Sequence, residues 1–263
     1  MNLTSNKPFA LSDNRLRIPL IAALLLTLAG PLMAKTLQEV TENYPLDANG
    51  AISLDNVNGD VEIRAWDETD VQLTYRISGK SEKTLERNKV KVKADASHLR
   101  VNTVHSKSNS WWGSSDGGSV SYELKVPMGT RLRSVETVNG SIEIVGVSGE
   151  VDAETVNGSI EVKGISADAK LSTVNGRVEA QLDRLQSDQR VSMESVNGQI
   201  VVYLPDDADV EIRAETVHGS LRNDFGLTVD KGMVGRDLRG QLGSGGGRLT
   251  LDTVNGSINI RRN

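Results

Sequence analysis

The stretch Glu154-Thr155-Val156-Asn157-Gly158-Ser159-Ile160-Glu161-Val162 contains the motif that decides the fold. Its centre, Val-Asn-Gly-Ser or a close variant, returns along the chain, and from Gly140 onward its glycines lie 18, 18, 22, 21 and 37 residues apart. A segment that returns at a near-constant period is a structural unit stacked on itself. The sequence therefore predicts an all-β protein: a parallel, right-handed β-helix-like β-solenoid with coils of about 18–22 residues. The predicted corners are Asn58, Gly59, Asn139, Gly140, Asn157, Gly158, Asn175, Gly176, Asn197, Gly198, His218, Gly219, Asn255 and Gly256.

Apolar residues alternate with polar ones on both sides of each corner. Ala153 and its counterparts precede the Val by three residues, and Ile160 and Val162 follow the Gly with Glu161 between them. This period of two is typical of half-buried strands. We expect Val156 to face the core, which requires the chain to bend before Asn-Gly, with glycine in a left-handed conformation. The alternative is a meander of two-residue hairpins, in which Val156 shares a face with Glu154.

The ends of the repeat region carry further predictions. The interval of 37 residues contains a degenerate copy of the motif, Leu238–Leu242, so we expect seven consecutive coils. The side chains of Asn139, Asn157, Asn175 and Asn197 should then form an amide ladder. The sequence printed ends directly after a strand, and Arg261 and Arg262 are expected to protect an open solenoid end from weak self-association. Before the repeats, alternation over residues 71–77, 90–92, 99–101 and 122–126 predicts antiparallel strands, with a helical turn or two within residues 80–88.

Residues 1–34 resemble a signal peptide. Lys7, Arg15 and Arg17 precede an apolar run over residues 18–33, and Ala34 is a small residue suited to cleavage. A retained membrane anchor is the alternative. After cleavage we expect no transmembrane segment, and a location in the periplasm, at the cell surface or outside the cell. The remaining organisation is an N-terminal β region at 35–134, with an exposed Ser/Gly-rich loop at 105–119, and a solenoid at 135–263, continuous enough to form one domain.

Composition excludes several classes of function. The chain has no cysteine, so it has neither disulfides nor thiolate chemistry. Its net charge is −5 and no basic stripe is visible, so we expect no nucleic-acid partner. No Ser-His-Asp set, no phosphate-binding loop and no metal-spaced His/Cys cluster is visible, so we predict no catalytic residue, no metal and no cofactor. His98 and His105 lie far along the chain from His218, which occupies an Asn position of the repeat.

The repeats resemble a known family. The segment Leu54-Asp55-Asn56-Val57-Asn58-Gly59-Asp60-Val61-Glu62-Ile63, a Val-Pro segment and the repeated Val-Asn-Gly-Ser-Ile-Glu-Ile are similar to the "putative adhesin" β-strand-repeat proteins. The resemblance covers roughly residues 40–260. It implies a β-repeat fold and a place among exported, envelope-associated bacterial proteins. It transfers no binding or catalytic residues.

Three surface features are candidate sites. Trp111 and Trp112 are adjacent aromatic residues in the Ser/Gly-rich loop, and exposed Trp can stack on sugars or anchor a protein interface. Two sets of acids share repeat positions, and a basic partner or divalent cations would relieve their mutual repulsion; a solvated polar face is the bland alternative. One Thr per turn raises ice binding as a remote option. The acid sets are Glu136, Glu154, Glu194, Glu215 and Asp252, and Glu143, Glu161 and Glu179.

The sequence thus favours a non-enzymatic exported interaction module, adhesin-like, whose partner is a glycan or an envelope or surface protein. A structural or stress-related envelope scaffold without a ligand of its own is the alternative. A polysaccharide-active β-helix enzyme comes third.

Overall fold

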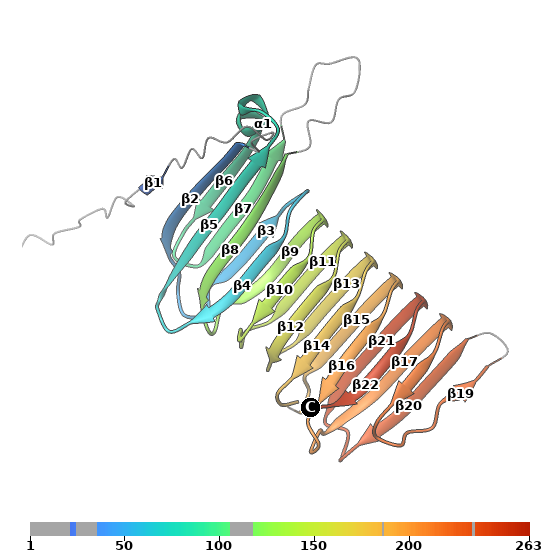
Figure 1. Ribbon diagram of the computed structural model, residues 1–263. Coiled ribbons are helices and arrows are strands. Elements are labelled where there is room, and N and C mark those ends of the chain that lie inside the picture. The colour runs from blue at the N-terminus through green and yellow to red at the C-terminus, as the bar shows by residue number, and fades with distance from the viewer. Residues whose placement is uncertain (1–21, 25–35, 106–117, 186, 233–234) are drawn as a thin grey trace, which may run out of the picture.

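The computed structural model describes residues 22–24, 36–105, 118–185, 187–232 and 235–263. It consists of two sheets, of eleven strands each, that enclose one elongated hydrophobic core (Figure 1). The only helix within the described residues is α1 (Glu82–Arg87), in the segment expected to hold a helical turn or two. The prediction of an all-β protein is confirmed.

The strands of each sheet follow one another in space in an order that differs from their order in the sequence. The first sheet runs β1 (Ala22–Leu24), β2 (Thr36–Pro45), β5 (Asp70–Gly79), β8 (Ser119–Pro127), β4 (Val61–Trp66), β10 (Ile142–Val145), β12 (Ile160–Ile165), β14 (Val178–Leu182), β16 (Ile200–Leu204), β22 (Ile258–Arg262), β18 (Leu221–Asn223). The second sheet runs β19 (Asp230–Lys231), β20 (Arg236–Leu242), β17 (Val210–His218), β21 (Gly247–Asn255), β15 (Arg190–Asn197), β13 (Ala169–Asn175), β11 (Val151–Asn157), β9 (Arg131–Asn139), β3 (Ala51–Asp55), β7 (His98–His105), β6 (Asn88–Ala94).

Each repeat forms one coil, which we define as a strand of the second sheet, an Asn-Gly corner and a strand of the first sheet. Neighbouring coils pair in parallel and in register, so that Thr155 lies opposite Thr173 and Ile160 opposite Val178. The core residues expected from alternation, such as Ala153, Leu171 and Ile160, are buried between the sheets. The hand of the coiling stays a prediction.

The corner glycines are required by close approach of neighbouring backbones. A Cβ placed on Gly158 would lie 1.9 Å from the carbonyl oxygen of Gly140, and one on Gly198 would lie 1.7 Å from that of Gly176. Of the corner glycines, only Gly59 has a positive φ, +124°. The expectation of a left-handed glycine at every corner is therefore wrong.

The Val of the motif lies on the outside of the molecule, which corrects the expectation that it faces the core. Val138, Val174, Val196 and Val254 are 37–43% exposed, whereas Thr155 beside Val156 is fully buried. The strand simply keeps its period of two up to the corner. The inner position suits Thr because its hydroxyl donates a hydrogen bond to the corner glycine carbonyl of the neighbouring coil. These bonds measure 2.9–3.4 Å and are made by Thr137, Thr155, Thr173, Ser195, Thr216 and Thr253.

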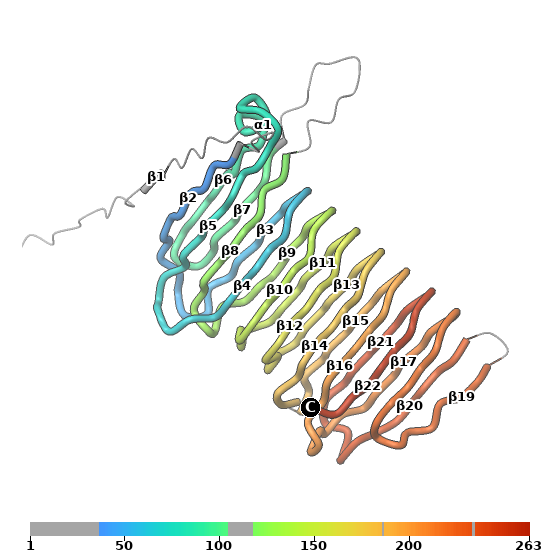
Figure 2. The backbone as a smooth tube through the Cα atoms, viewed as in Figure 1, coloured from blue at the N-terminus to red at the C-terminus, as the bar shows by residue number. Residues whose placement is uncertain are grey.

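The coils do not stack in sequence order at either end of the molecule. In Figure 2 the red coil β21–β22 lies between β15–β16 and the orange coil β17–β18. At the other end, the blue coil β3–β4 lies between β7–β8 and β9–β10. The expected run of seven consecutive coils is therefore wrong, because glycine spacing along the chain does not reveal which coil neighbours which.

Two predictions about the C-terminal end are corrected by this arrangement. The degenerate copy Leu238–Leu242 is no coil: it belongs to β20, which pairs antiparallel with β17. Arg261 and Arg262 do not cover an open end, since β22 is paired with β16 on one side and β18 on the other. Arg262 instead pairs with Asp206 at 2.6 Å and lies 4.7 Å from the ring centre of Phe225.

The region before the repeats has the predicted antiparallel strands, with β5 on β8 and β6 on β7. A strand that the sequence did not predict, β2, pairs antiparallel with β5. It also joins the stack, because β8 pairs in parallel with β4 and β7 with β3. The predicted signal segment lies outside the described residues except for β1, which pairs with β2. In the part of the chain that the structure describes, no helix is both long and apolar enough to cross a membrane. The domain boundary at residue 135 stays a prediction.

Candidate functional site: the outer face of the second sheet

The outer face of the second sheet carries four rows of side chains that run across the strands. On β15 the successive outward residues are Arg190, Ser192, Glu194 and Val196, and on β21 they are Arg248, Thr250, Asp252 and Val254. Parallel pairing in register places equivalent repeat positions side by side. The face therefore changes from charged at the strand starts, through hydroxyl-bearing and acidic, to apolar beside the corners.

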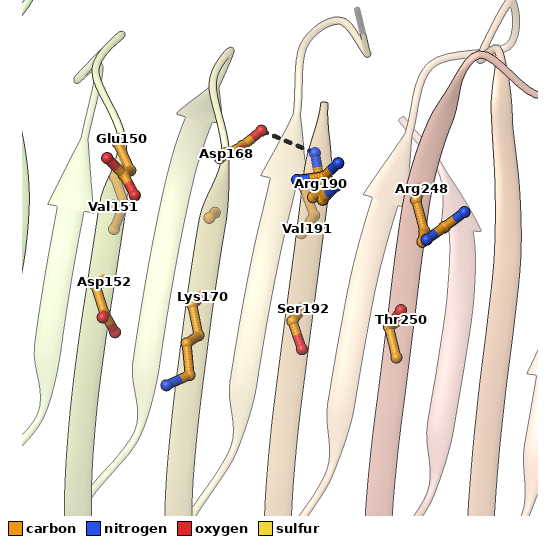
Figure 3. A pocket seen from close by; sticks show the side chains of 11 residues that line it. Glu150, Val151, Asp152, Asp168, Lys170, Arg190, Val191, Ser192, Arg248 and Thr250 are labelled. Atoms are coloured by element: carbon orange, nitrogen blue, oxygen red, sulfur yellow. Dashed lines mark hydrogen bonds between the residues drawn. The ribbon is translucent and has the colours of Figure 1, made fainter. Parts of the chain in front are cut away.

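A shallow groove of about 320 Å³ lies at the strand starts. Figure 3 shows Asp152, Lys170, Ser192 and Thr250 in one line across four strands, with Glu150, Asp168, Arg190 and Arg248 beyond them. The Asp168 carboxylate accepts a hydrogen bond of 2.8 Å from the backbone N–H of Arg190 (Figure 3). Burial raises the pKa of Asp152, although Lys170 counteracts this. Three acids (Glu150, Asp152 and Asp168) and three bases (Lys170, Arg190 and Arg248) line this groove, so its formal charge is balanced.

The acidic row forms a nearly continuous line of carboxylates. Opposite one another on successive strands lie Asp55, Glu136, Glu154, then Ser172 as the one interruption, then Glu194, Asp252, Glu215 and Asp237. None of these carboxylates forms an ion pair with any residue that the structure describes. Burial raises the pKa of Asp252, with added repulsion from Glu194 and Glu215. Burial and the charge of Glu136 raise the pKa of Asp55 in the same way.

The other predicted set of acids, on the outer face of the first sheet, is neutralised. Arg64 bonds to Glu62 and lies 2.9 Å from Glu143. Lys163 and Arg177 lie 2.5 and 3.2 Å from the carboxylates of Glu161 and Glu179. Among the residues that the structure describes, the row of acids without ion pairs therefore lies on the second sheet.

The valine row lies directly beside the acidic row. It consists of the motif residues Val138, Val156, Val174, Val196, Val254 and Val217, from six successive strands. A groove of about 280 Å³ runs along it, and its walls include Val174, Val196, Val217, Val254 and the acids Glu194, Glu215 and Asp252. A contiguous exposed apolar patch rimmed by polar groups is typical of an interaction site.

The corner residues form a hydrogen-bonded ladder at the edge of this face. The Asn amides donate to one another over 2.8–3.0 Å from Asn139 to Asn58, Asn157 to Asn139, Asn175 to Asn157, Asn197 to Asn175 and Asn255 to Asn197. His218 lies opposite Asn255 where a further Asn would extend the ladder. The ladder fixes the corners and leaves the strand faces free for other roles.

The remaining predicted site residues are not brought together. Trp111 and Trp112 lie outside the described residues, in the connection that joins β7 to β8. His98 on β7 and His218 on β17 lie near opposite ends of the second sheet, and His98 contacts Ser53 at 3.1 Å. Among the described residues, no group of three or more His, Cys, Asp or Glu side chains is placed to hold a metal ion. The row of Thr is buried, so the surface array required for ice binding is not formed by it.

Sequence reasoning missed three parts of this region. Asp55 and Asp237 extend the acidic row from strands outside the aligned repeats, and only the sheet order reveals them. The prediction that the Val of the motif faces the core is wrong, because Val196 alternates with buried Ser195 and shares the outer face with Glu194. Asn56 is buried beside the first corner, where it donates to the carbonyl oxygens of Gly59 and Val120 and accepts from Thr103.

Comparison with known proteins identifies the repeat region. Residues 133–261 match the model of the Toastrack DUF4097 family. No curated protein matches the chain. Among solved structures, a putative cell adhesion protein from Clostridium sporogenes is similar, with 14% identity, 87% of this chain and 100% of that chain covered, and a TM-score of 0.44. A putative adhesin from Bacteroides fragilis is also similar, with 13% identity, 89% of this chain and 100% of that chain covered, and a TM-score of 0.41. Residues 133–261 form a Toastrack DUF4097 domain, and the resemblance to the putative-adhesin β-strand-repeat proteins predicted from the motifs is confirmed.

Proposed function

We propose that this chain is an exported, non-enzymatic β-solenoid of the cell envelope that acts as an adhesin-like interaction module. Its binding surface is the outer face of the second sheet. The observation that carries this proposal is the pair of adjacent rows on that face, one of carboxylates without ion pairs and one of exposed Val. Both rows are maintained over successive coils, which buried-core requirements do not explain, because these side chains lie outside the core.

The solenoid suits this role because its interior is fixed independently of its surface. The Thr hydroxyls and Asn amides hold neighbouring coils together at the corners. The outward residues between the corners therefore determine what the surface binds, and stacking repeats them into an extended surface.

The alternative is a structural scaffold of the envelope without a ligand of its own. In-cell photocrosslinking separates the two. A photoreactive phenylalanine analogue at Val196 is expected to give discrete crosslinked species, whereas the same residue at Tyr203, on the outer face of the first sheet, is expected to give none. If neither position gives crosslinks while both variants accumulate normally, the scaffold replaces the interaction module.

Trp111 and Trp112 are proposed as a second binding element, directed at glycans. Saturable binding of a glycan by the protein, lost on combined Trp111→Ala and Trp112→Ala replacement, is the expected result. Unchanged binding in the double variant would remove this loop from the proposal without affecting the sheet face.

Export is proposed from residues 1–34. Fractionation of cells, followed by mass spectrometry of the N-terminus, is expected to recover the protein outside the cytoplasm with its N-terminus at Lys35. Recovery from the cytoplasm would contradict the proposed location. A membrane-bound protein with an intact N-terminus would identify the segment as an anchor.

A further inference from the structure

We propose that the acidic and valine rows together bind one cationic amphipathic α-helix of a partner protein, laid across the strands along the stack. This inference rests on the proposed function, because it names the class of partner that the outer face of the second sheet takes.

Charge complementarity indicates the first property of the partner. The acidic row brings carboxylates to neighbouring strands at a spacing of about 4.8 Å, and no described basic side chain pairs with them. Like charges opposite one another across strands destabilise a sheet. Lys or Arg side chains from a partner would relieve this repulsion. Burial raises the pKa of Asp252, and repulsion from Glu194 and Glu215 raises it further.

The valine row supplies the second property. Its members lie two residues beyond the acids on the way to the corner and on the same face, because residues two apart in a strand point to the same side. Val196, for example, follows Glu194 and is 41% exposed. A partner that covers both rows must carry a line of apolar side chains beside its line of positive charges.

The spacing of the rows favours a helix over an extended strand. Successive turns of an α-helix are about 5.4 Å apart, and residues three and four apart are about 5–6 Å from each other, close to the strand spacing of about 4.8 Å. Alternate residues of an extended chain repeat at about 6.6 Å and fall out of step within a few strands. The six strands that carry the valine row span about 24 Å, which corresponds to a helix of about 16 residues.

The outer face of the first sheet provides a matched control. It has acids in equivalent positions, but Lys163 and Arg177 already pair with Glu161 and Glu179. A surface whose row of carboxylates is already closed by ion pairs should not attract the same helix.

Titration of the full-length protein with a labelled 16-residue peptide tests the inference. The peptide carries Lys along one helical stripe and Leu along the neighbouring stripe, and a second peptide has the same composition in scrambled order. We expect saturable binding of the first peptide, with an affinity that falls as the salt concentration is raised. The scrambled peptide should bind at least about tenfold more weakly. The combined change Glu194→Gln with Asp252→Asn, and separately Val196→Ser with Val254→Ser, should each weaken binding about tenfold.

The control variant, Glu161→Gln with Glu179→Gln, should bind the first peptide as the unchanged protein does. Circular dichroism on every variant verifies that the fold is intact. The inference is overturned if both peptides bind equally, if the control variant loses as much affinity as the acidic-row variant, or if the face binds only anionic or neutral lipid vesicles or Ca²⁺. Crosslinks from Val196 to a partner without such a helix would overturn it while leaving the proposed function in place.

Discussion

Replacing Thr155 by Val tests which side of each second-sheet strand faces the core. Thr155 is fully buried, and its hydroxyl donates a 2.9 Å hydrogen bond to the carbonyl oxygen of Gly140 in the neighbouring coil. Val has nearly the same shape but no donor, so the half-buried Gly140 carbonyl loses this partner. The neighbouring change, Val156→Thr, places a hydroxyl at an outward position and serves as the matched control.

The magnitude follows from the hydrogen bond and the methyl group. Leaving a fully buried acceptor without its partner costs about 1–3 kcal/mol, so the upper end of this range is a limit for the half-buried Gly140 carbonyl. Burying a methyl group in place of the hydroxyl restores up to about 0.8 kcal/mol. The Thr155→Val variant should therefore lose about 1–2 kcal/mol of unfolding free energy, whereas Val156→Thr should change it by less than about 0.5 kcal/mol.

Urea unfolding followed by far-UV circular dichroism measures both free energies, and thermal scans should show a fall of about 2–8 °C for the first variant. The reverse pattern would refute the assignment. A neutral Thr155→Val with a costly Val156→Thr would mean that Val faces the core and that the acidic row and the valine row are not on one surface.

Three further predictions follow from the same structure. Gly198→Ala should lower the melting temperature strongly, because the new Cβ would lie 1.7 Å from the Gly176 oxygen, whereas Gly226→Ala, at φ +72° with open space around it, should cost only about 1–2 kcal/mol. Asp252→Asn should stabilise the protein at pH 7, because the folded-state pKa of Asp252 is raised and its ionisation therefore opposes folding above that pKa. The difference in unfolding free energy between the variant and the unchanged protein should shrink as the pH falls through the folded-state pKa. A difference that widens on acidification would contradict this. The combined change Arg261→Thr with Arg262→Thr should lower the melting temperature, since Arg262 contacts Asp206 and Phe225 within the molecule. The sedimentation of this variant at high concentration should not change. Concentration-dependent association would instead mean that the two Arg protect an open end of the solenoid.

The sequence predicted the coil and its corners because these depend on local chemistry. Val-Asn-Gly marks a tight corner, and Ile160 and Val162 around Glu161 mark a half-buried strand; both signals are complete within one repeat. The amide ladder follows from the same repeat, since identical coils in register place Asn157 beside Asn175. Which face Val156 occupies could not be predicted, because hydrophobicity alone favours the core. The reason for a hydrogen-bond donor at Thr155 is clear only when the structure places the Gly140 carbonyl beside it.

The candidate surface could be predicted only in part. Glu154 and Glu194 share a repeat position, but their lack of ion pairs, in contrast to Glu161 with Lys163, depends on rotamers and neighbours across coils. Asp237 reaches the row through an antiparallel strand, which no repeat alignment includes. The order of coils is equally hidden, because β21 and β17 carry similar outward and inward residues and compete for the same place in the stack.

That competition has a consequence for how the chain reaches its folded state. The coil β17–β18 is synthesised before β21–β22, yet the later coil separates it from β15–β16. Glu194 and Glu215 both lie opposite Asp252, so β15 and β17 carry matching patterns and can pair directly while β21 is still absent. Such a premature pairing must dissociate before the last coil can enter, which makes it a kinetic trap. Folding after the whole segment is available avoids the trap, so the export proposed above, if it delivers an unfolded chain, would favour the correct order of coils over folding during synthesis.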